Sequence, residues 1–282
     1  MLKRIGIVFN DRMAAATALA SSLSQMLRGK GHDCWDSPAE NDDKLRELAG
    51  GTDLIVTVGG DGTILRTARH AVPAQVPILG VNMGNVGFMT EFNGSVAMEQ
   101  VPRYLSSECW IEERAVLDVE VTQEANTTPK VHRSWALNEV VVGRDAPARL
   151  VSIDARIDSA ELTTYKADGV IVATATGSTA YALAVGGPVL DPRCQELLLL
   201  PVSPHMSLAN PIVVHQDSVV ELIVGAGHEA TASLDGQVDY KLQAGDRIVA
   251  RRSHQVARFL RGKSPTYFYA TLTQRLNMRG KR

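Results

Sequence analysis

The stretch LIVTVGGDGTILRTA, residues 54–68, restricts the possible folds more than any other part of the sequence. A run of mostly β-branched residues leads directly into Gly59, Gly60, Asp61 and Gly62, after which apolar residues recur at helical spacing. A strand without polar alternation is typical of a parallel sheet that helices cover on both faces. The stretch therefore predicts a buried parallel strand, a sharp glycine turn and a helix.

The first third of the chain repeats this alternation of strand and helix. The expected strands and helices cover residues 4–9, 14–31, 53–58, 62–71 and 76–82. After about residue 107 the pattern changes to short alternating segments separated by turn residues, including Asp235-Gly236, which predicts antiparallel β structure. We therefore expect an α/β domain with a parallel sheet over residues 1–107, followed by a mainly β domain over residues 108–264.

Length and charge limit the class of protein. The chain has 282 residues, 45% of them hydrophobic, which is enough for two domains with a substantial core. A net charge of −2 argues against a nucleic-acid binder. The charge is uneven, because residues 247–282 hold ten Lys and Arg and no Asp or Glu. That basic end is either a solvated strand and tail or a surface that attracts a phosphate-rich substrate.

Cysteine usage and hydropathy indicate the compartment. Cys34, Cys109 and Cys194 have neither zinc-ligand nor disulfide spacing, which is typical of reduced thiols in a cytosolic protein. No apolar run approaches the roughly 20 residues that a membrane-spanning helix needs. We expect a soluble cytoplasmic protein that does not contact a membrane.

The glycine turn has the composition of an anion site. Successive glycines let the backbone approach a ligand, and their N–H groups, with the start of the following helix, attract phosphate. The motif is neither G-x-G-x-x-G nor a Walker A loop, since no Lys follows. Its central Asp61 suits Mg²⁺ handling or general-base work on a hydroxyl. Alternatively, Asp61 only caps the helix while the glycines turn the chain.

Two polar segments stand out in the second half. TATGSTAY, residues 174–181, offers four hydroxyls before a short helix; Asp168 precedes its strand, and Tyr181 is suited to stack on a base. A tightly packed turn of small residues is the alternative. Asn138-Glu139 interrupts an apolar strand, where an amide suits a base edge and a carboxylate suits a ribose diol. These two residues are alternatively half-exposed positions on an antiparallel strand.

Taken together, these motifs resemble those of bacterial NAD kinases. The resemblance is carried, in order, by VGGDGTILRTAR, GVNMGNVGFMTE, LNEVVV, ADGVIVATATGSTAYALAVGGPVL and SLDGQ. G-G-D-G alone is shared with several lipid kinases and phosphofructokinase-type enzymes, whereas the T-x-T-G-S-T-A-Y block is specific. Ala175 stands where the family usually has Pro, and Lys166 where many members have Arg, so a phosphate contact there would be monodentate.

The resemblance implies a two-domain fold, with the chain end at about 265–282 packing back on the first domain, and an NAD-binding second domain. It also implies homodimers or homotetramers with NAD sites near subunit contacts. The reaction would transfer phosphate from ATP, with Mg²⁺, to the adenosine 2′-hydroxyl of NAD⁺, with Asp61 as the base and no dedicated metal ligands. The implied nucleotide contacts are Gly59, Gly60, Gly62, Arg66, Asn138, Glu139, Arg149, Lys166, Asp168, Thr176, Thr179, Ala180, Tyr181, Ala182, Leu183, Ala184 and Gln237.

Several points stay open at the level of sequence. Arg66 is either a phosphate contact or a surface helix residue, and Asn82 and Phe88 either line the floor of the site or, for Phe88, belong to the core. A G-G-D-G-T lipid kinase and a non-catalytic NADP(H)-binding sensor are the alternative functions. The sequence does not distinguish ATP from polyphosphate as donor or NAD⁺ from NADH as acceptor, nor does it define the oligomer or feedback by NADP(H).

Overall fold

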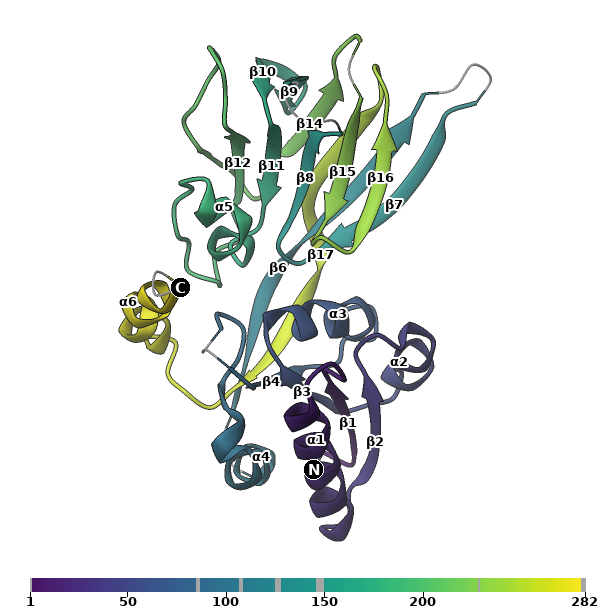
Figure 1. The fold of residues 1–282 in the computed structure, drawn as a ribbon, viewed down its shortest axis with the longest axis vertical. Helices are drawn as coiled ribbons and strands as arrows, with labels where there is room; N and C mark the ends of the chain where they lie inside the picture. Colours follow the sequence, from purple (N-terminus) through teal and green to yellow (C-terminus); the bar gives the residue numbers. More distant parts are fainter. Residues whose placement is uncertain are drawn as a thin grey trace. The chain divides into compact units, whose positions relative to one another are not determined.

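The structure, a computed structural model, describes residues 2–84, 87–106, 109–124, 128–145, 150–227 and 229–279, with only the backbone of 277–279. The chain forms two compact units (Figure 1). Unit 1 contains Met1–Glu113 and Val256–Arg282, and unit 2 contains Arg114–Gln255. Two long strands, β6 (Trp110–Gln123) and β17 (Arg247–Arg261), each have residues in both units.

Unit 1 is an α/β unit with a parallel sheet. Its strands lie in the order β17-β4-β3-β1-β2, with β5 beside β4, and neighbouring strands within it run parallel. The elements are β1 (Arg4–Phe9), α1 (Ala14–Gly29), β2 (Asp33–Pro38), α2 (Asp42–Ala49), β3 (Leu54–Gly59), α3 (Asp61–Ala71), β4 (Ile78–Asn82), β5 (Phe92–Asn93), η1 (Gly94–Val96), α4 (Ala97–Ser106) and α6 (Tyr267–Arg279).

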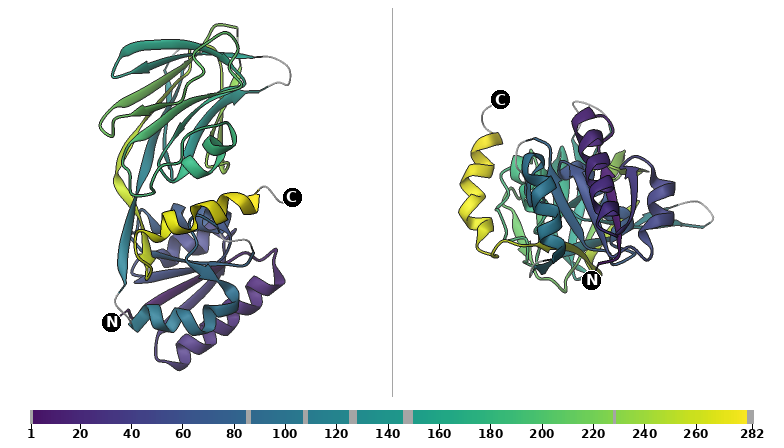
Figure 2. Two further views of the ribbon diagram at one scale, coloured as in Figure 1. Left: turned by 90° about the vertical axis from the view of Figure 1, so that its left-hand side faces the viewer. Right: turned by 90° about the horizontal axis from the view of Figure 1, so that it is seen from below.

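Helices cover both faces of this sheet. On one face, α1 and α4 pack side by side over apolar residues of β1, β3 and β4, such as Val56 and Val58 (Figure 2). On the other face α3 lies so close that a Cβ at Gly80 would meet the Ile64 side chain at 2.8 Å. Because β3 is buried on both faces, its continuous apolar sequence is explained.

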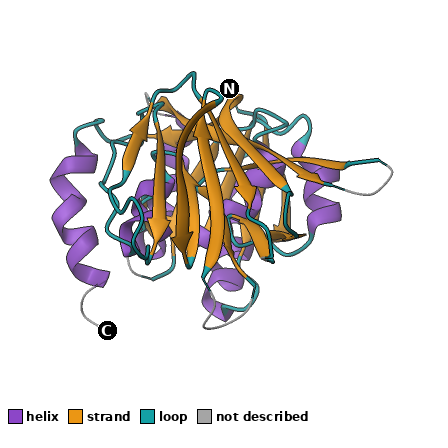
Figure 3. Cartoon of the chain, turned by 90° about the horizontal axis from the view of Figure 1, so that it is seen from above, coloured by secondary structure: helices purple, strands orange, loops and turns teal. Residues whose placement is uncertain are grey.

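Unit 2 is built mostly from antiparallel strands (Figure 3). One sheet has the order β10-β9-β14-β17, with β6 paired to β17 and to β7, and the other has the order β13-β12-β11-β8-β15-β16. The remaining elements are β7 (Lys130–Ala136), β8 (Glu139–Arg144), β9 (Val151–Ile157), β10 (Ala160–Ala167), β11 (Gly169–Ala173), η2 (Gly177–Thr179), α5 (Tyr181–Ala184), β12 (Leu197–Val202), β13 (Ile212–Val214), β14 (Val219–Val224), β15 (Ala230–Leu234) and β16 (Val238–Leu242).

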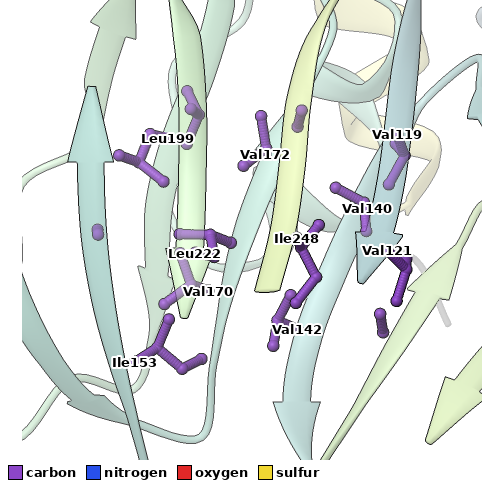
Figure 4. Close-up of a cluster of buried hydrophobic side chains, with 14 of the residues drawn as sticks. Val119, Val121, Val140, Val142, Ile153, Val170, Val172, Leu199, Leu222 and Ile248 are labelled. Carbon is purple, nitrogen blue, oxygen red and sulfur yellow. The ribbon is translucent and has the colours of Figure 1, made fainter. Parts of the chain in front are cut away.

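The core of unit 2 draws on both sheets. Val119, Val140, Val172, Leu222 and Ile248 are almost fully buried in one cluster (Figure 4). Strands such as β14 and β15 bury every second residue, as expected for a sheet with one face toward this core. β11 and β12 are buried along their whole length, because a second apolar cluster that includes α5 covers their other face.

The predicted fold class is confirmed, with local additions. Each strand and helix expected in the first third is present, and the second half is antiparallel as expected. The segment 265–282, for which the pattern allowed a helix or a strand, contains α6. The short elements β2, α2, β5 and α4 were not anticipated. Of the described helices, none combines the length and the apolar character that crossing a membrane requires.

Candidate functional site

The glycine turn of unit 1 joins β3 to α3. β3 ends at Gly59 and α3 begins at Asp61. A Cβ on Gly59 would overlap the Thr63 side chain, so this position needs glycine for packing. A Cβ on Gly60 or on Gly62 would meet nothing within 4 Å. Of the three predicted glycines, one is therefore required by the fold, and the other two border open space beside the first turn of a helix, where backbone amides favour anions.

Asp61 does not cap its own helix. The N-cap residue is Gly60, and no side chain caps α3. The Asp61 carboxylate instead accepts the backbone N–H of Phe88 at Oδ2 (3.0 Å) and of Met89 at Oδ1 (3.2 Å). A Cβ on Gly87 would overlap the same carboxylate, so this glycine lets the loop come close. The capping alternative is wrong, and the loop at 87–89 is a contact that the sequence did not reveal.

The other predicted residues of unit 1 surround this turn differently. Arg66 is 39% exposed and forms an ion pair with Glu40, its Nη2 lying 3.4 Å from Oε1. Asn82 is buried and binds the backbone of Gly84 through both its side-chain oxygen and nitrogen. Phe88 is also buried. An exposed ion pair contributes little to stability, so Arg66 can exchange Glu40 for a phosphate at low cost.

In unit 2, the backbone of Asn138 and Glu139 is held by the carboxylate of Asp235, which the sequence pattern predicted only as part of a turn. Asp235 accepts three consecutive backbone N–H groups, from Leu137 (2.7 Å), Asn138 (2.8 Å) and Glu139 (3.1 Å). Asp235 has a positive φ of 52°, a conformation that Asp tolerates better than most residues. The predicted Asp-Gly turn thus aligns the backbone from which both predicted ligand side chains project.

The loop after β11 lies against the same two residues. Ala173 pairs with Glu139, and the Thr174 N–H donates to the Asn138 carbonyl at 2.8 Å. A Cβ on Gly177 would overlap the Asn138 carbonyl and meet Glu139 Oε2 at 2.9 Å. Only glycine fits there, so the first turn of the loop closes directly over Glu139.

Three of the four hydroxyls of this loop donate hydrogen bonds to backbone carbonyls. Thr174 Oγ1 donates to the Leu137 carbonyl, Ser178 Oγ to the Ala175 carbonyl and Thr179 Oγ1 to the Thr176 carbonyl. Thr176 is different, because its buried Oγ1 has no hydrogen-bond partner among the described residues. The expectation of four available hydroxyls is thereby reduced to one that is clearly unsatisfied.

Three buried polar atoms in this part of unit 2 lack partners among the described residues. They are Asn138 Oδ1, Glu139 Oε2 and Thr176 Oγ1. Burial, with a further contribution from the nearby Asp235, raises the pKa of Glu139 to about 8. An unsatisfied buried polar atom is costly, and native structures usually satisfy such atoms. This group therefore has the character of a site that a polar ligand completes.

The remaining predicted residues of unit 2 fall into two groups. Tyr181 begins α5, which follows the loop beside Glu139, and it is 42% exposed. Gln237 follows the Asp235-Gly236 turn, in which the Asp235 N–H donates to the Glu139 carbonyl. Asp168 lies at the opposite end of β11, about 20 Å from Thr174 by strand length. Asp168 forms an ion pair with Arg144, and Lys166 lies nearby on β10. Arg149 lies outside the described residues.

The rest of the predicted loop contacts accompany α5. Ala182 is buried in the cluster over β11 and β12, whereas Ala184 is exposed. Ala180 and Leu183 are half-buried. The described residues contain no group of three or more His, Cys, Asp or Glu that could hold a metal ion.

Comparisons with known proteins identify the same two halves. Residues 2–109 match the family described as the ATP-NAD kinase N-terminal domain, and residues 137–262 match the ATP-NAD kinase C-terminal domain. A protein of Dehalococcoides mccartyi (strain CBDB1) named NAD kinase is 41% identical over 276 residues, which cover 98% of this chain and 96% of that protein.

Solved structures agree. An NAD kinase from Archaeoglobus fulgidus in complex with ATP aligns with a TM-score of 0.76 at 27% identity, over 96% of this chain and 98% of the other. Yeast NADH kinase complexed with NADH shares the fold, with a TM-score of 0.85 at 22% identity, over 98% of this chain and 88% of the other. With both of its halves matched, and with a relative 41% identical over almost its whole length, this chain belongs to the NAD kinase family.

Proposed function

We propose that this protein transfers the terminal phosphate of ATP to the 2′-hydroxyl of the adenosine ribose of NAD⁺, giving ADP and NADP⁺. The observation that carries the proposal is a group of buried atoms without a hydrogen-bond partner among the described residues, namely Asn138 Oδ1, Glu139 Oε2 and Thr176 Oγ1. A nucleoside supplies hydroxyls and a base edge to such atoms, whereas the acyl chains of a lipid would leave them unsatisfied. Family membership favours the same function over a lipid kinase or a non-catalytic sensor.

The adenosine of NAD⁺ is proposed to bind in unit 2. Glu139 would accept hydrogen bonds from ribose hydroxyls, and Asn138 would bind the base edge. Thr176 would add its free hydroxyl, and the half-exposed Tyr181 would cover the ring. The remaining contacts in this proposal are Arg149, Lys166, Asp168, Thr179, Ala180, Ala182, Leu183, Ala184 and Gln237.

Asp61 of unit 1 is the proposed base. It would take the proton of the 2′-hydroxyl while that oxygen bonds to the transferred phosphorus and the bond to the leaving ADP breaks. The N–H groups of Phe88 and Met89 hold the carboxylate in one orientation, and each of its oxygens keeps a further lone pair for the hydroxyl. Gly60 and Gly62 would give the phosphates of ATP access to backbone amides, and Gly59 and Arg66 would complete this side.

Mg²⁺ would enter with the phosphates of ATP. Apart from Asp61, the glycine turn of unit 1 has no carboxylate, and this donor set suits an ion that keeps its phosphate and water ligands. When bound, the ion would neutralise charge on the phosphates.

The domain and assembly expectations are part of the proposal. Residues 1–107 with the chain end would form the α/β nucleotide-binding domain, and residues 108–264 the NAD-binding domain of a cytoplasmic enzyme. We propose a homodimer or homotetramer, which light scattering would detect. Lys166 and Asp168, a strand's length from Thr174, would then serve a dinucleotide bound to another copy. Activity regained on mixing inactive E139A and K166A variants would support this, and no regain would oppose it.

The deciding experiment uses the purified protein with MgATP and, in parallel, NAD⁺, NADH and diacylglycerol. Phosphorus NMR of the product should place the new phosphate on the adenosine 2′-oxygen. NAD⁺ lacking that hydroxyl should be neither phosphorylated nor bound well, because unpaired site groups reject such analogues strongly. Loss of the nicotinamide-ribose 2′-hydroxyl should matter less. A phosphate on another oxygen, or turnover of the adenosine 2′-deoxy analogue, would remove the assignment.

A further inference from the structure

Arg275 on α6 is a buried cation that has no hydrogen-bond or ion-pair partner among the described residues. Its residue is only 6% exposed, and its guanidinium lies over the rings of Phe88 and Tyr267, at 5.7 Å from each centroid. Its buried Nε has no hydrogen-bond partner, and the described part of the chain provides no hydrogen bond or ion pair to this side chain. Burying a guanidinium against aromatic faces is unfavourable unless another group accepts its hydrogen bonds.

The acidic groups around Arg275 are already occupied. Arg261 pairs with Glu91 at 3.1 Å and with Glu112 at 2.9 Å. Glu91 also accepts a hydrogen bond from the Tyr104 hydroxyl at 2.9 Å. Burial, followed by the charge of Arg261, lowers the pKa of Arg275, while Tyr267, Asp61 and Glu91 raise it. A guanidinium remains protonated even so, and among the described residues Arg275 is the cation of this cluster that no carboxylate contacts directly.

The position of Arg275 connects it to the glycine turn. One of the two rings that it covers belongs to Phe88, whose backbone N–H donates to Asp61 Oδ2. Asp61 lies near enough for its charge to affect Arg275. Within unit 1 the chain thus combines a carboxylate held by two amides, open space at Gly60 and Gly62, and a buried guanidinium that no described side chain contacts through a hydrogen bond or ion pair. A phosphate has the charge and the oxygen geometry that this combination lacks.

We propose that the guanidinium of Arg275 binds a phosphate group of the nucleotide at the glycine turn, so that α6 contributes a substrate-contacting residue. This inference rests on the proposed function for its substrate, but it concerns phosphate binding and not the acceptor. The planar guanidinium can donate two parallel hydrogen bonds to phosphate oxygens, which a lysine cannot do. No described side chain offers the guanidinium a direct hydrogen bond or ion pair that a phosphate would have to displace.

The test measures binding of magnesium tripolyphosphate by calorimetry in wild type, R275M, R275K and K263M. Lys263 is a matched control: its ammonium lies 4.0 Å from the centroid of the same Tyr267 ring, but it already donates to the Glu91 carbonyl at 2.8 Å. R275M should weaken binding by about 10–100-fold, R275K should retain part of the affinity, and K263M should stay within about twofold.

Thermal unfolding of the same variants without ligand separates a binding role from a structural one. Because this buried charge has no direct hydrogen bond or ion pair among the described residues, its removal should leave the unfolding midpoint of R275M unchanged or higher, even though its binding is weaker. Tripolyphosphate affinity of R275M equal to wild type would overturn the inference. Equal losses of affinity and stability in R275M and K263M would also overturn it, because the cluster would then act only through packing.

Two further measurements keep the test decisive. If R275M does not fold, wild type itself is examined: tripolyphosphate should slow amide hydrogen exchange in α6, and unchanged exchange would overturn the inference. Kinetics with MgATP and NAD⁺ distinguish the two proposals. If R275M phosphorylates NAD⁺ as well as wild type does, the phosphate-binding role of Arg275 is wrong and the proposed function stands. If tripolyphosphate binding depends on Arg275 but the protein does not phosphorylate NAD⁺, the proposed function is wrong and the role of Arg275 stands.

Discussion

The carboxylate of Asp235 accepts the backbone N–H of Glu139 at 3.1 Å, although 96 residues separate them in sequence. The same carboxylate binds the two preceding amides and helps to raise the pKa of Glu139. One side chain therefore aligns the backbone from which Asn138 and Glu139 project and, after burial, contributes to the raised pKa of the proposed ribose ligand.

Removing this carboxylate should disturb both stability and NAD⁺ binding. In D235A, three amides lose a charged acceptor, and hydrogen bonds to charged groups contribute about 1.5–3 kcal/mol. We expect a loss of that order in the free energy of unfolding, measured with urea, together with a higher KM for NAD⁺. D145A is the control, since Asp145 is a carboxylate of the same unit that pairs at the surface with Thr231 and Lys241. Normal KM in a destabilised D235A would leave Asp235 with a purely structural role.

Asp61→Asn tests the proposed base. The amide has nearly the same shape but cannot take a proton, and general-base catalysis contributes about 10²–10⁴-fold. We expect kcat to fall by at least that range in an initial-rate assay, with NAD⁺ still bound. The control is D53N: Asp53 likewise accepts two backbone amides, from Lys3 and Arg4, but lies before β3. Similar kcat values for D61N and D53N would mean that Asp61 only holds the loop at 87–89.

The raised pKa of Glu139 predicts how stability depends on pH. In the folded protein the pKa of this carboxyl is raised to about 8, against an ordinary value of 4.5. Between these values the folded state holds a proton that the unfolded state has lost. Its contribution is complete below the unfolded pKa and is lost as the pH rises through the folded one. Urea unfolding should therefore show wild type losing stability relative to E139Q across this window. Parallel pH profiles for the two proteins would contradict the assignment.

Gly62→Ala should separate stability from activity. Gly62 lies in the first turn of α3 with nothing within 4 Å of its missing Cβ, and alanine in a helix is favoured over glycine by about 0.5–1 kcal/mol. The variant should unfold at a higher temperature, yet its KM for MgATP should rise because the methyl group occupies phosphate space. G29A is matched to it, since Gly29 ends α1 with equally open surroundings. An unchanged KM in G62A would place the phosphates elsewhere.

How much of this site the sequence could reveal depended on the range of the interactions. The turn at Gly59–Asp61 and the loop after β11 were predictable, because glycine, apolar periodicity and small-residue composition are local signals. Neither the capture of backbone amides by Asp235 nor the packing of Arg275 on Phe88 leaves a local signal. The partner of each is more than 90 residues away, and a lone Asp-Gly or Arg reads as a turn or a solvated charge.

The elements that the sequence did not reveal have a similar explanation. The sequence of β2, DCWDSP, is too polar for a strand pattern, and it is stabilised by pairing with β1 along its whole length. α2 has only eight residues, but the Asn41 side chain caps its start by accepting the backbone N–H of Lys44, and the helix packs against α3. Tertiary contacts determine whether such segments form a strand or a helix, whereas a continuous apolar run such as β3 indicates a buried strand from its sequence alone.

The return of β17 to unit 1 has a consequence for synthesis on the ribosome. Arg261, which forms ion pairs with Glu91 and Glu112, donates to the Met89 carbonyl from 172 residues further along the chain. Domains usually fold in the order in which they emerge, but here the ion pairs of Arg261 with Glu91 and Glu112 cannot form until the last segment of the first-made unit leaves the exit tunnel. The antiparallel unit, although translated later, is complete earlier. Truncated nascent chains ending before residue 256 should thus be most vulnerable to proteolysis in their N-terminal half.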